Sequence, residues 1–168
     1  PRGNYGISKY KASKYLKKIG KKNNFPYTIL RLYQVYGPNQ SNNRIIPITI
    51  NACLKDKNFP CTKGFQKRDF LYIDDLINLI KKIICSKTKI KGIFNVGSLY
   101  PVKVKNVIKM IHKKIKKGYP MYDRIPMRKD ELMQYFPNTK KLSKIISWHP
   151  KVSLSSGINK TIRSYQFK

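Results

Sequence analysis

Asn4-Tyr5-Gly6-Ile7-Ser8-Lys9 is the stretch that first indicates the fold of this chain. A tyrosine and a lysine four residues apart lie on the same face of a helix, one turn from each other. A free phenol has a pKa of about 10 and is therefore a poor base near neutral pH. A nearby ammonium group stabilises the phenolate. The Tyr5–Lys9 spacing therefore predicts a group that exchanges a proton with a substrate hydroxyl.

The spacing alone is not specific, because Tyr10 and Lys14 repeat it in a chain that is rich in lysine. For an isolated pair of this kind, the alternative is a solvated helix face. Four later segments distinguish between these interpretations. They are residues 31–38 (RLYQVYGP), 44–47 (RIIP), 66–75 (QKRDFLYIDD) and 94–98 (FNVGS).

In this order and at these intervals, the segments resemble the extended short-chain dehydrogenases/reductases, and within them the NAD-dependent epimerase/dehydratase family of nucleotide-sugar enzymes. The resemblance covers residues 4–164, and Tyr5 lies at the family's interval from Arg31 whereas Tyr10 lies too close. It implies an α/β fold, namely the C-terminal half of a Rossmann-like NAD(P)-binding fold plus a small substrate-binding lobe. We expect residues of about 1–40 and 69–98 on the Rossmann side, and about 41–68 and 119–168 in the lobe.

The resemblance also implies the roles of the site residues. Tyr5 is the expected acid/base, and Lys9 is expected to hold the nicotinamide ribose, so that both contact NAD or NADP. Arg68 matches the arginine that binds the substrate diphosphate in the family. The remaining expected substrate-binding residues are Gln34, Asn43, Arg44 and Arg128.

Two of these substrate positions have local alternatives. Gln34 stands where the family usually has an asparagine that contacts the sugar, and an ordinary loop amide is the alternative for it. Arg44 is expected beside the nucleotide, where a guanidinium binds phosphate in a two-pronged geometry; the alternative is an exposed loop arginine. For Arg128, the alternative is a surface ion pair with Glu131.

The chain starts at Pro1 and contains no Gly-x-x-Gly-x-x-Gly motif, with which the family opens. We therefore expect a C-terminal fragment that is inactive by itself. The family's partner serine or threonine also precedes the tyrosine. Epimerase, dehydratase, reductase and decarboxylase activities consequently stay open, with epimerase or ketosugar reductase preferred. A catalytically inactive remnant is the first alternative.

The charge suggests a second alternative. The chain has 37 Lys and Arg against 7 Asp and Glu, a net charge of +30, which favours a polyanion- or nucleic-acid-binding module. The lysines are spread along every segment instead of being clustered. We therefore expect a nucleotide-sugar as the partner and no specific nucleic acid.

The remaining composition indicates a protein without a metal or a membrane anchor. Cys53, Cys61 and Cys85 show no metal-binding spacing, and His112 and His149 lie far apart. No apolar run is long enough to span a bilayer. We expect a cytoplasmic protein, which forms a homodimer as the full-length enzyme.

Hydrophobic periodicity predicts the secondary structure. Expected helices cover residues 5–22, 75–86, 102–117 and 151–165, with a further helix after a loop within 41–57. Expected strands cover residues 27–33, 58–61, 68–73 and 91–97. Asp74 is expected to cap the second helix and Gly118 to end the third, with a hairpin turn at residues 63–64 and irregular chain over 119–136. Asp69 and Trp148 are expected to be structural.

Overall fold

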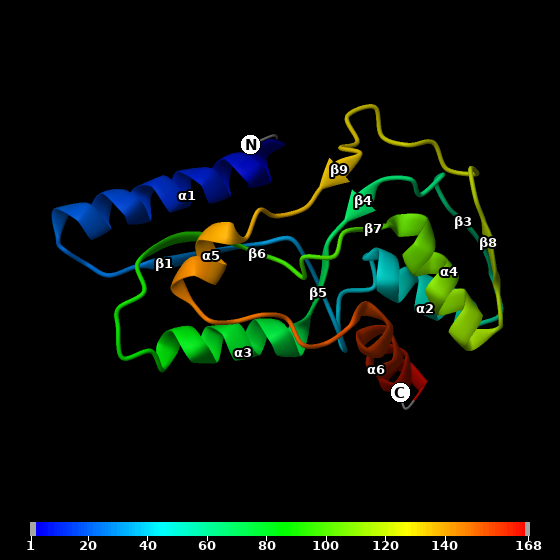
Figure 1. Ribbon diagram of the computed structural model, residues 1–168. Helices are drawn as coiled ribbons and strands as arrows, with labels where there is room; N and C mark the ends of the chain where they lie inside the picture. Colours follow the sequence, from blue (N-terminus) through cyan, green and yellow to red (C-terminus); the bar gives the residue numbers. More distant parts are fainter. Residues whose placement is uncertain (1–2, 167–168) are drawn as a thin grey trace.

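The computed structural model describes residues 3–166 (Figure 1). The helices are α1 (Gly3–Lys22), α2 (Ile45–Leu54), α3 (Ile73–Ile84), α4 (Val104–Ile115), α5 (Lys140–Ile145) and α6 (Leu154–Gln166). The strands are β1 (Thr28–Leu32), β2 (Gln34–Tyr36), β3 (Asn58–Pro60), β4 (Lys67–Arg68), β5 (Phe70–Tyr72), β6 (Gly92–Val96), β7 (Val102–Lys103), β8 (Tyr119–Met121) and β9 (Gln134–Tyr135).

Most strand pairs are parallel and join segments that are distant in the sequence. β1 pairs with β6 over its whole length, β2 with β5, and β3 with β8. β4 lies between β7, which is antiparallel to it, and β9, which is parallel. Helices connect the parallel strands, as parallel pairing requires. The predicted α/β class is therefore confirmed.

Two extended segments, residues 28–36 and 67–72, each change their strand partner where the two segments meet. The first is interrupted at Tyr33, between β1 and β2, and the second at Asp69, between β4 and β5. The Asp69 carboxylate is buried and accepts hydrogen bonds from the backbone N–H groups of Ser98 (2.5 Å) and Leu99 (2.9 Å). The prediction of one strand over 68–73 is therefore wrong, whereas the structural role of Asp69 is confirmed.

The buried apolar residues form two clusters. One joins α2, α4 and α6 to β2 and β5, with Ile50, Val107 and Ile158 fully buried. The other joins β6, α3 and the segment around α5, and it includes Phe94 and Trp148. The packing role predicted for Trp148 is confirmed. Removal of this apolar surface from water supplies the main stabilisation of the fold.

Helix α1 contributes little to either cluster. Within residues 3–166, Gly20 is its one buried residue. A side chain at Gly20 would overlap the Tyr27 ring, because an added Cβ would lie 2.3 Å from a ring carbon. The apolar side chains Tyr15 and Leu16 are exposed. The apolar face predicted for residues 5–22 is therefore formed but not buried.

Both predicted helix boundaries at Asp74 and Gly118 are wrong. Helix α3 begins before Asp74, whose carboxylate lies in the first turn and pairs with Lys160 at 3.4 Å. An acid there still interacts favourably with the helix dipole. Helix α4 ends at Ile115 because Lys116 takes the left-handed conformation, with φ of 59°.

Two loop predictions are also wrong. No hairpin forms at residues 63–64, since β3 pairs with β8 and β4 pairs with β7 and β9. Residues 119–136 are not entirely irregular, because they contain β8 and β9.

Within residues 3–166, no helix is both long and apolar enough to cross a membrane.

Candidate functional site

Tyr5 and Lys9 lie together on the exposed side of α1. The Lys9 Nζ atom is 5.6 Å from the centroid of the Tyr5 ring, and Tyr5 is 77% exposed. An ammonium group over an aromatic face is a favourable contact. Tyr10 and Lys14 have the same arrangement, at 5.5 Å. Local geometry therefore does not distinguish the two pairs.

Their position along α1 does differ. The amino end of α1 lies towards the carboxyl ends of β1 and β6, where open α/β sheets bind ligands (Figure 1). Tyr5 is close to this end of the helix. Tyr10 lies about 7.5 Å further along the axis, at 1.5 Å per residue. The sheet edge therefore favours Tyr5 as the residue next to a ligand.

Gln34 begins β2 immediately after the break at Tyr33. Its backbone N–H donates to the Asp69 carbonyl at 3.3 Å, and it is paired with Phe70. Gln34 is therefore placed at the carboxyl end of β1, on the strand that pairs with β5. Arg68 lies on β4, which precedes Asp69 and β5 in the chain and pairs with β7 and β9.

Arg68 is held by several groups. Its guanidinium donates hydrogen bonds of 2.7 Å to the carbonyls of Lys67 and Leu132, and it forms an ion pair with Glu131. The Arg68 and Glu131 side chains are only 12% and 21% exposed. The guanidinium carbon also lies 6.0 Å from the centroid of the Tyr135 ring. These contacts fix the orientation of Arg68.

Arg128 does not form the ion pair with Glu131 that was the alternative for it. Its carbonyl accepts the Glu131 N–H at 3.1 Å, whereas the Glu131 carboxylate binds Arg68. The alternative of an Arg128–Glu131 surface pair is therefore wrong. Arg128 is exposed in the segment that leads to β9.

Asn43 and Arg44 form the loop that enters α2. Arg44 immediately precedes the helix in an extended conformation, and its N–H donates to the Ser41 carbonyl at 3.2 Å. Ser41 Oγ donates to Asn43 Oδ1 at 3.0 Å. Asn43 also lines an open polar cavity of about 700 Å³ together with Asn39, Gln40, Ser41, Asn42, Asn51 and Tyr165.

The predicted residues are therefore only partly brought together. Within residues 3–166, no hydrogen bond or ion pair joins Tyr5 or Lys9 to a predicted substrate-binding residue, or the Arg44 loop to Arg68. In the same part of the chain, no three His, Cys, Asp or Glu side chains are grouped closely enough to hold a metal ion.

The sequence did not predict the contacts of three residues here: Glu131 and Tyr135 contact Arg68, and Tyr33 packs on Tyr135. The rings of Tyr33 and Tyr135 lie 4.8 Å apart. Burial, and secondly the proximity of Tyr135, raises the pKa of Tyr33. No local sequence pattern signals these contacts, because they join residues 63 or more positions apart. The tertiary structure places an aromatic pair and an acid around the predicted diphosphate-binding arginine.

Parallel strand pairs connected by helices define a Rossmann-like α/β protein. A family model described as "NAD dependent epimerase/dehydratase family" matches residues 1–97, more than half of the chain. The chain therefore belongs to the NAD-dependent epimerase/dehydratase family, as its motifs indicated.

Two curated relatives extend the match beyond residue 97. CDP-abequose synthase of Salmonella muenchen is 32% identical over 141 residues, covering 79% of this chain and 46% of that protein. The dTDP-4-dehydro-6-deoxyglucose reductase of Escherichia coli is 30% identical over 175 residues, covering 100% of this chain and 54% of that protein. The chain spans about half the length of the curated relatives it matches.

A solved structure supports the same conclusion. UDP-glucuronic acid 4-epimerase from Bacillus cereus, in complex with UDP-glucuronic acid and NAD, superposes with a TM-score of 0.90 at 28% identity, covering 100% of this chain and 54% of that chain. The expected Rossmann-like α/β fold is thereby confirmed, over about half of that chain's length. NAD as the cofactor of this family is confirmed as well.

Proposed function

We propose that this chain is part of an NAD(P)-dependent epimerase, dehydratase or reductase that acts on a nucleotide-sugar, with Tyr5 as the acid/base. The observation that carries the proposal is the Tyr5–Lys9 pair, exposed on α1 towards the carboxyl edge of the parallel strands. Relatives named as nucleotide-sugar dehydratases, reductases and epimerases support it. Epimerase or ketosugar reductase is the preferred activity.

In this proposal, the Tyr5 hydroxyl exchanges a proton with a hydroxyl or ketone of the sugar. Lys9 provides an ammonium group for the nicotinamide ribose and a positive charge beside the phenol. The bound dinucleotide supplies the hydride chemistry. The high exposure of Tyr5 fits this use, since its hydroxyl is accessible to a ligand. The 168 residues contain no Gly-x-x-Gly-x-x-Gly loop for the pyrophosphate, so they would hold only the ribose end.

On the substrate side, Arg68 would bind the diphosphate, with Arg44 and Arg128 as further cations. Gln34 and Asn43 would offer amides to the sugar and the nucleotide. The Arg68–Glu131 pair and the Tyr135 ring hold the guanidinium in one orientation, and a phosphate would contact the N–H groups that these partners leave available. The relatives' names include CDP-, dTDP- and UDP-linked sugars, so the nucleotide stays open.

The first experiment measures substrate binding. Isothermal titration calorimetry of the chain with UDP-, dTDP- and CDP-glucose is expected to show binding of at least one of them. Arg68→Lys keeps the charge but loses the two-pronged geometry, and it should weaken that binding about 10-fold, or about 1.4 kcal/mol. Arg163→Lys, at an exposed position of α6, is the matched control. Equal affinities of the two variants would contradict the assignment of Arg68.

The second experiment concerns turnover. The 168-residue chain alone is expected not to reduce NAD with any nucleotide-sugar, and appearance of NADH absorbance would contradict this. Sequencing the coding DNA upstream of Pro1 tests whether such a loop is encoded there. With that loop supplied, Tyr5→Phe should lower turnover about 10²- to 10⁴-fold, whereas Tyr10→Phe should leave it unchanged.

A polyanion-binding role is the second candidate. The observation in its favour is the charge of +30, with only three ion pairs within residues 3–166. It predicts salt-sensitive binding of duplex DNA of any sequence that survives Arg68→Lys, measured by fluorescence anisotropy. Such binding without any nucleotide-sugar binding would favour this role, or an inactive remnant, over the enzyme.

The homodimer and the cytoplasmic location stay predictions.

A further inference from the structure

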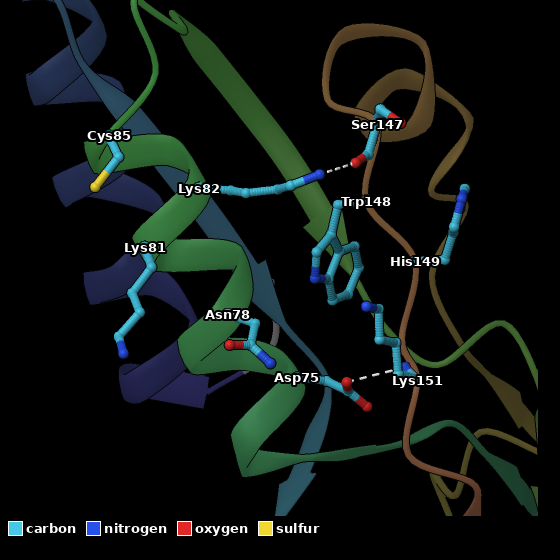
Figure 2. Close-up of a pocket in the computed structure, with 9 residues that line it drawn as sticks. All are labelled: Asp75, Asn78, Lys81, Lys82, Cys85, Ser147, Trp148, His149 and Lys151. Carbon is cyan, nitrogen blue, oxygen red and sulfur yellow. Dashed lines mark hydrogen bonds between the residues drawn. The ribbon is translucent and has the colours of Figure 1, made fainter.

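A cavity of about 470 Å³ lies between α3 and residues 147–151, on the side of the sheet away from α1 (Figures 1 and 2). Its walls include Asn78, Lys82 and Cys85 on one side and Ser147, Trp148 and Lys151 on the other. Its lining includes neither the Tyr5–Lys9 pair nor Arg68, Glu131 and Tyr135. Its volume is within the range of about 300–1,000 Å³ typical of small-molecule sites.

The two walls are tied together by hydrogen bonds. The Asp75 carboxylate, 1% exposed, accepts the backbone N–H groups of Lys151 (2.9 Å) and Val152 (3.0 Å). The Lys82 ammonium donates to the Ser147 carbonyl on the opposite wall. Trp148 is 9% exposed and belongs to a buried apolar cluster. The cavity is therefore formed in advance, which lowers the entropic cost of binding a ligand.

The charge of the lining is strongly positive. Lys81, Lys82 and Lys151 are exposed at its edge, and none of them belongs to an ion pair within residues 3–166. The single acidic group of the lining, Asp75, is occupied by backbone N–H groups. Figure 2 shows the Lys82 and Lys151 amino groups near opposite ends of the Trp148 indole. The cavity therefore combines an apolar surface with cations that have no acidic partner within residues 3–166, and such cations attract an anion.

We propose that this cavity binds a small organic anion, namely a phosphate carried on a flat aromatic or heterocyclic ring. The ring packs against the accessible edge of Trp148, and the phosphate contacts Lys82 and Lys151. A phosphate monoester carries about −1.5 to −2 charges at pH 7, which matches two ammonium groups better than a carboxylate does. The proposal is independent of the nucleotide-sugar site.

The chain carries two reporters at this cavity. Trp148 is its one tryptophan, and Cys85 is exposed whereas Cys53 and Cys61 are buried. Phenyl phosphate is the probe, with inorganic phosphate and phenol as controls for the charge and the ring. Phenyl phosphate should change Trp148 fluorescence in a saturable way and slow Cys85 alkylation by iodoacetamide at least 3-fold. Neither control compound should do so at the same concentration and ionic strength.

Paired variants test the two lysines. Lys82→Gln with Lys151→Gln should weaken phenyl phosphate binding about 10-fold, from two contacts of about 0.7 kcal/mol each. Lys17→Gln with Lys18→Gln, exposed on α1, removes the same charge and should leave binding unchanged. Lys151→Gln alone, with an expected 3-fold loss, serves if circular dichroism shows that the double variant is unfolded.

Four outcomes would overturn the proposal. They are the absence of a saturable signal, an equal response to inorganic phosphate, unchanged affinity in the Lys82/Lys151 variants, and equal loss in the α1 control. Arg68→Lys should leave the Trp148 response unchanged, so failure of this proposal and failure of the nucleotide-sugar proposal are separate results.

Discussion

Helices α1 and α4 are both rich in lysine, yet they differ in how they pack. α4 buries Val104, Val107, Ile108 and Ile111 against neighbouring elements, whereas Gly20 is the one residue that α1 buries within residues 3–166. The helix with the proposed catalytic pair thus contributes little to the core. Stability and the proposed chemistry therefore reside in different regions, which mutations can separate.

The largest difference is expected from truncating an apolar side chain in each helix. Ile111 is fully buried, so Ile111→Ala should lower the free energy of unfolding by about 2–5 kcal/mol, because it creates a cavity. Ile7→Ala, at a position 40% exposed on α1, should cost less than about 0.5 kcal/mol. Urea titrations followed by circular dichroism measure both, and similar losses would refute the comparison.

The next largest change in the free energy of unfolding is expected at Asp69, a buried acid outside α1. Asp69→Asn weakens two hydrogen bonds from backbone N–H groups and should cost about 1–3 kcal/mol. Asp130→Asn, at an exposed position, is the control and should be close to neutral. The same urea titration applies, and a neutral Asp69→Asn would show that the charge of this carboxylate is not needed.

A smaller effect is expected at high pH. Burial raises the pKa of Tyr122 to about 12, whereas an unfolded tyrosine titrates near 10. The folded state therefore favours the neutral phenol, and this contribution to stability is complete below pH 10 and is lost as the pH rises towards 12. Urea midpoints measured between pH 8 and 11 should therefore decrease.

Tyr122→Phe tests the cause of this decrease. The Tyr122 hydroxyl is buried without a hydrogen-bond partner within residues 3–166, so its removal should change stability at pH 8 by about 0 to 1 kcal/mol in the favourable direction. The variant should also lose less stability above pH 10 than the original chain. An unchanged pH dependence would assign the loss to other buried groups, such as Cys53, whose pKa burial raises to about 11.

The smallest effect is expected at the proposed acid/base. Tyr5→Phe and the matched Tyr10→Phe should each change the free energy of unfolding by less than about 0.5 kcal/mol, because both hydroxyls are on the poorly packed helix. Differential scanning calorimetry measures both. A loss of more than 1 kcal/mol in Tyr5→Phe alone would show that Tyr5 has a structural role.

Elements with local signals were predicted well. Helix α4 and strand β6 follow from their apolar patterns, and the Tyr5–Lys9 spacing places both side chains on one helix face. Errors occurred where a distant residue decides the local structure. The strand predicted over 68–73 is interrupted because Asp69 binds the loop after β6.

Contacts between distant residues also explain which parts of the candidate site the sequence did not predict. Glu131 was considered as a partner of nearby Arg128, but its carboxylate binds Arg68, and Tyr135 packs on Tyr33. Neither contact follows from spacing along the chain. The cavity beside Trp148 is similarly formed by two segments that only the fold brings together.

The sequence by itself determined the family, the α/β class and the Tyr5–Lys9 pair, because motifs and periodicity act over a few residues. The tertiary structure alone decided which acid holds Arg68, which face of α1 stays exposed and where the Trp148 cavity lies. These features depend on contacts between residues far apart in the chain, whose proximity is a property of packing.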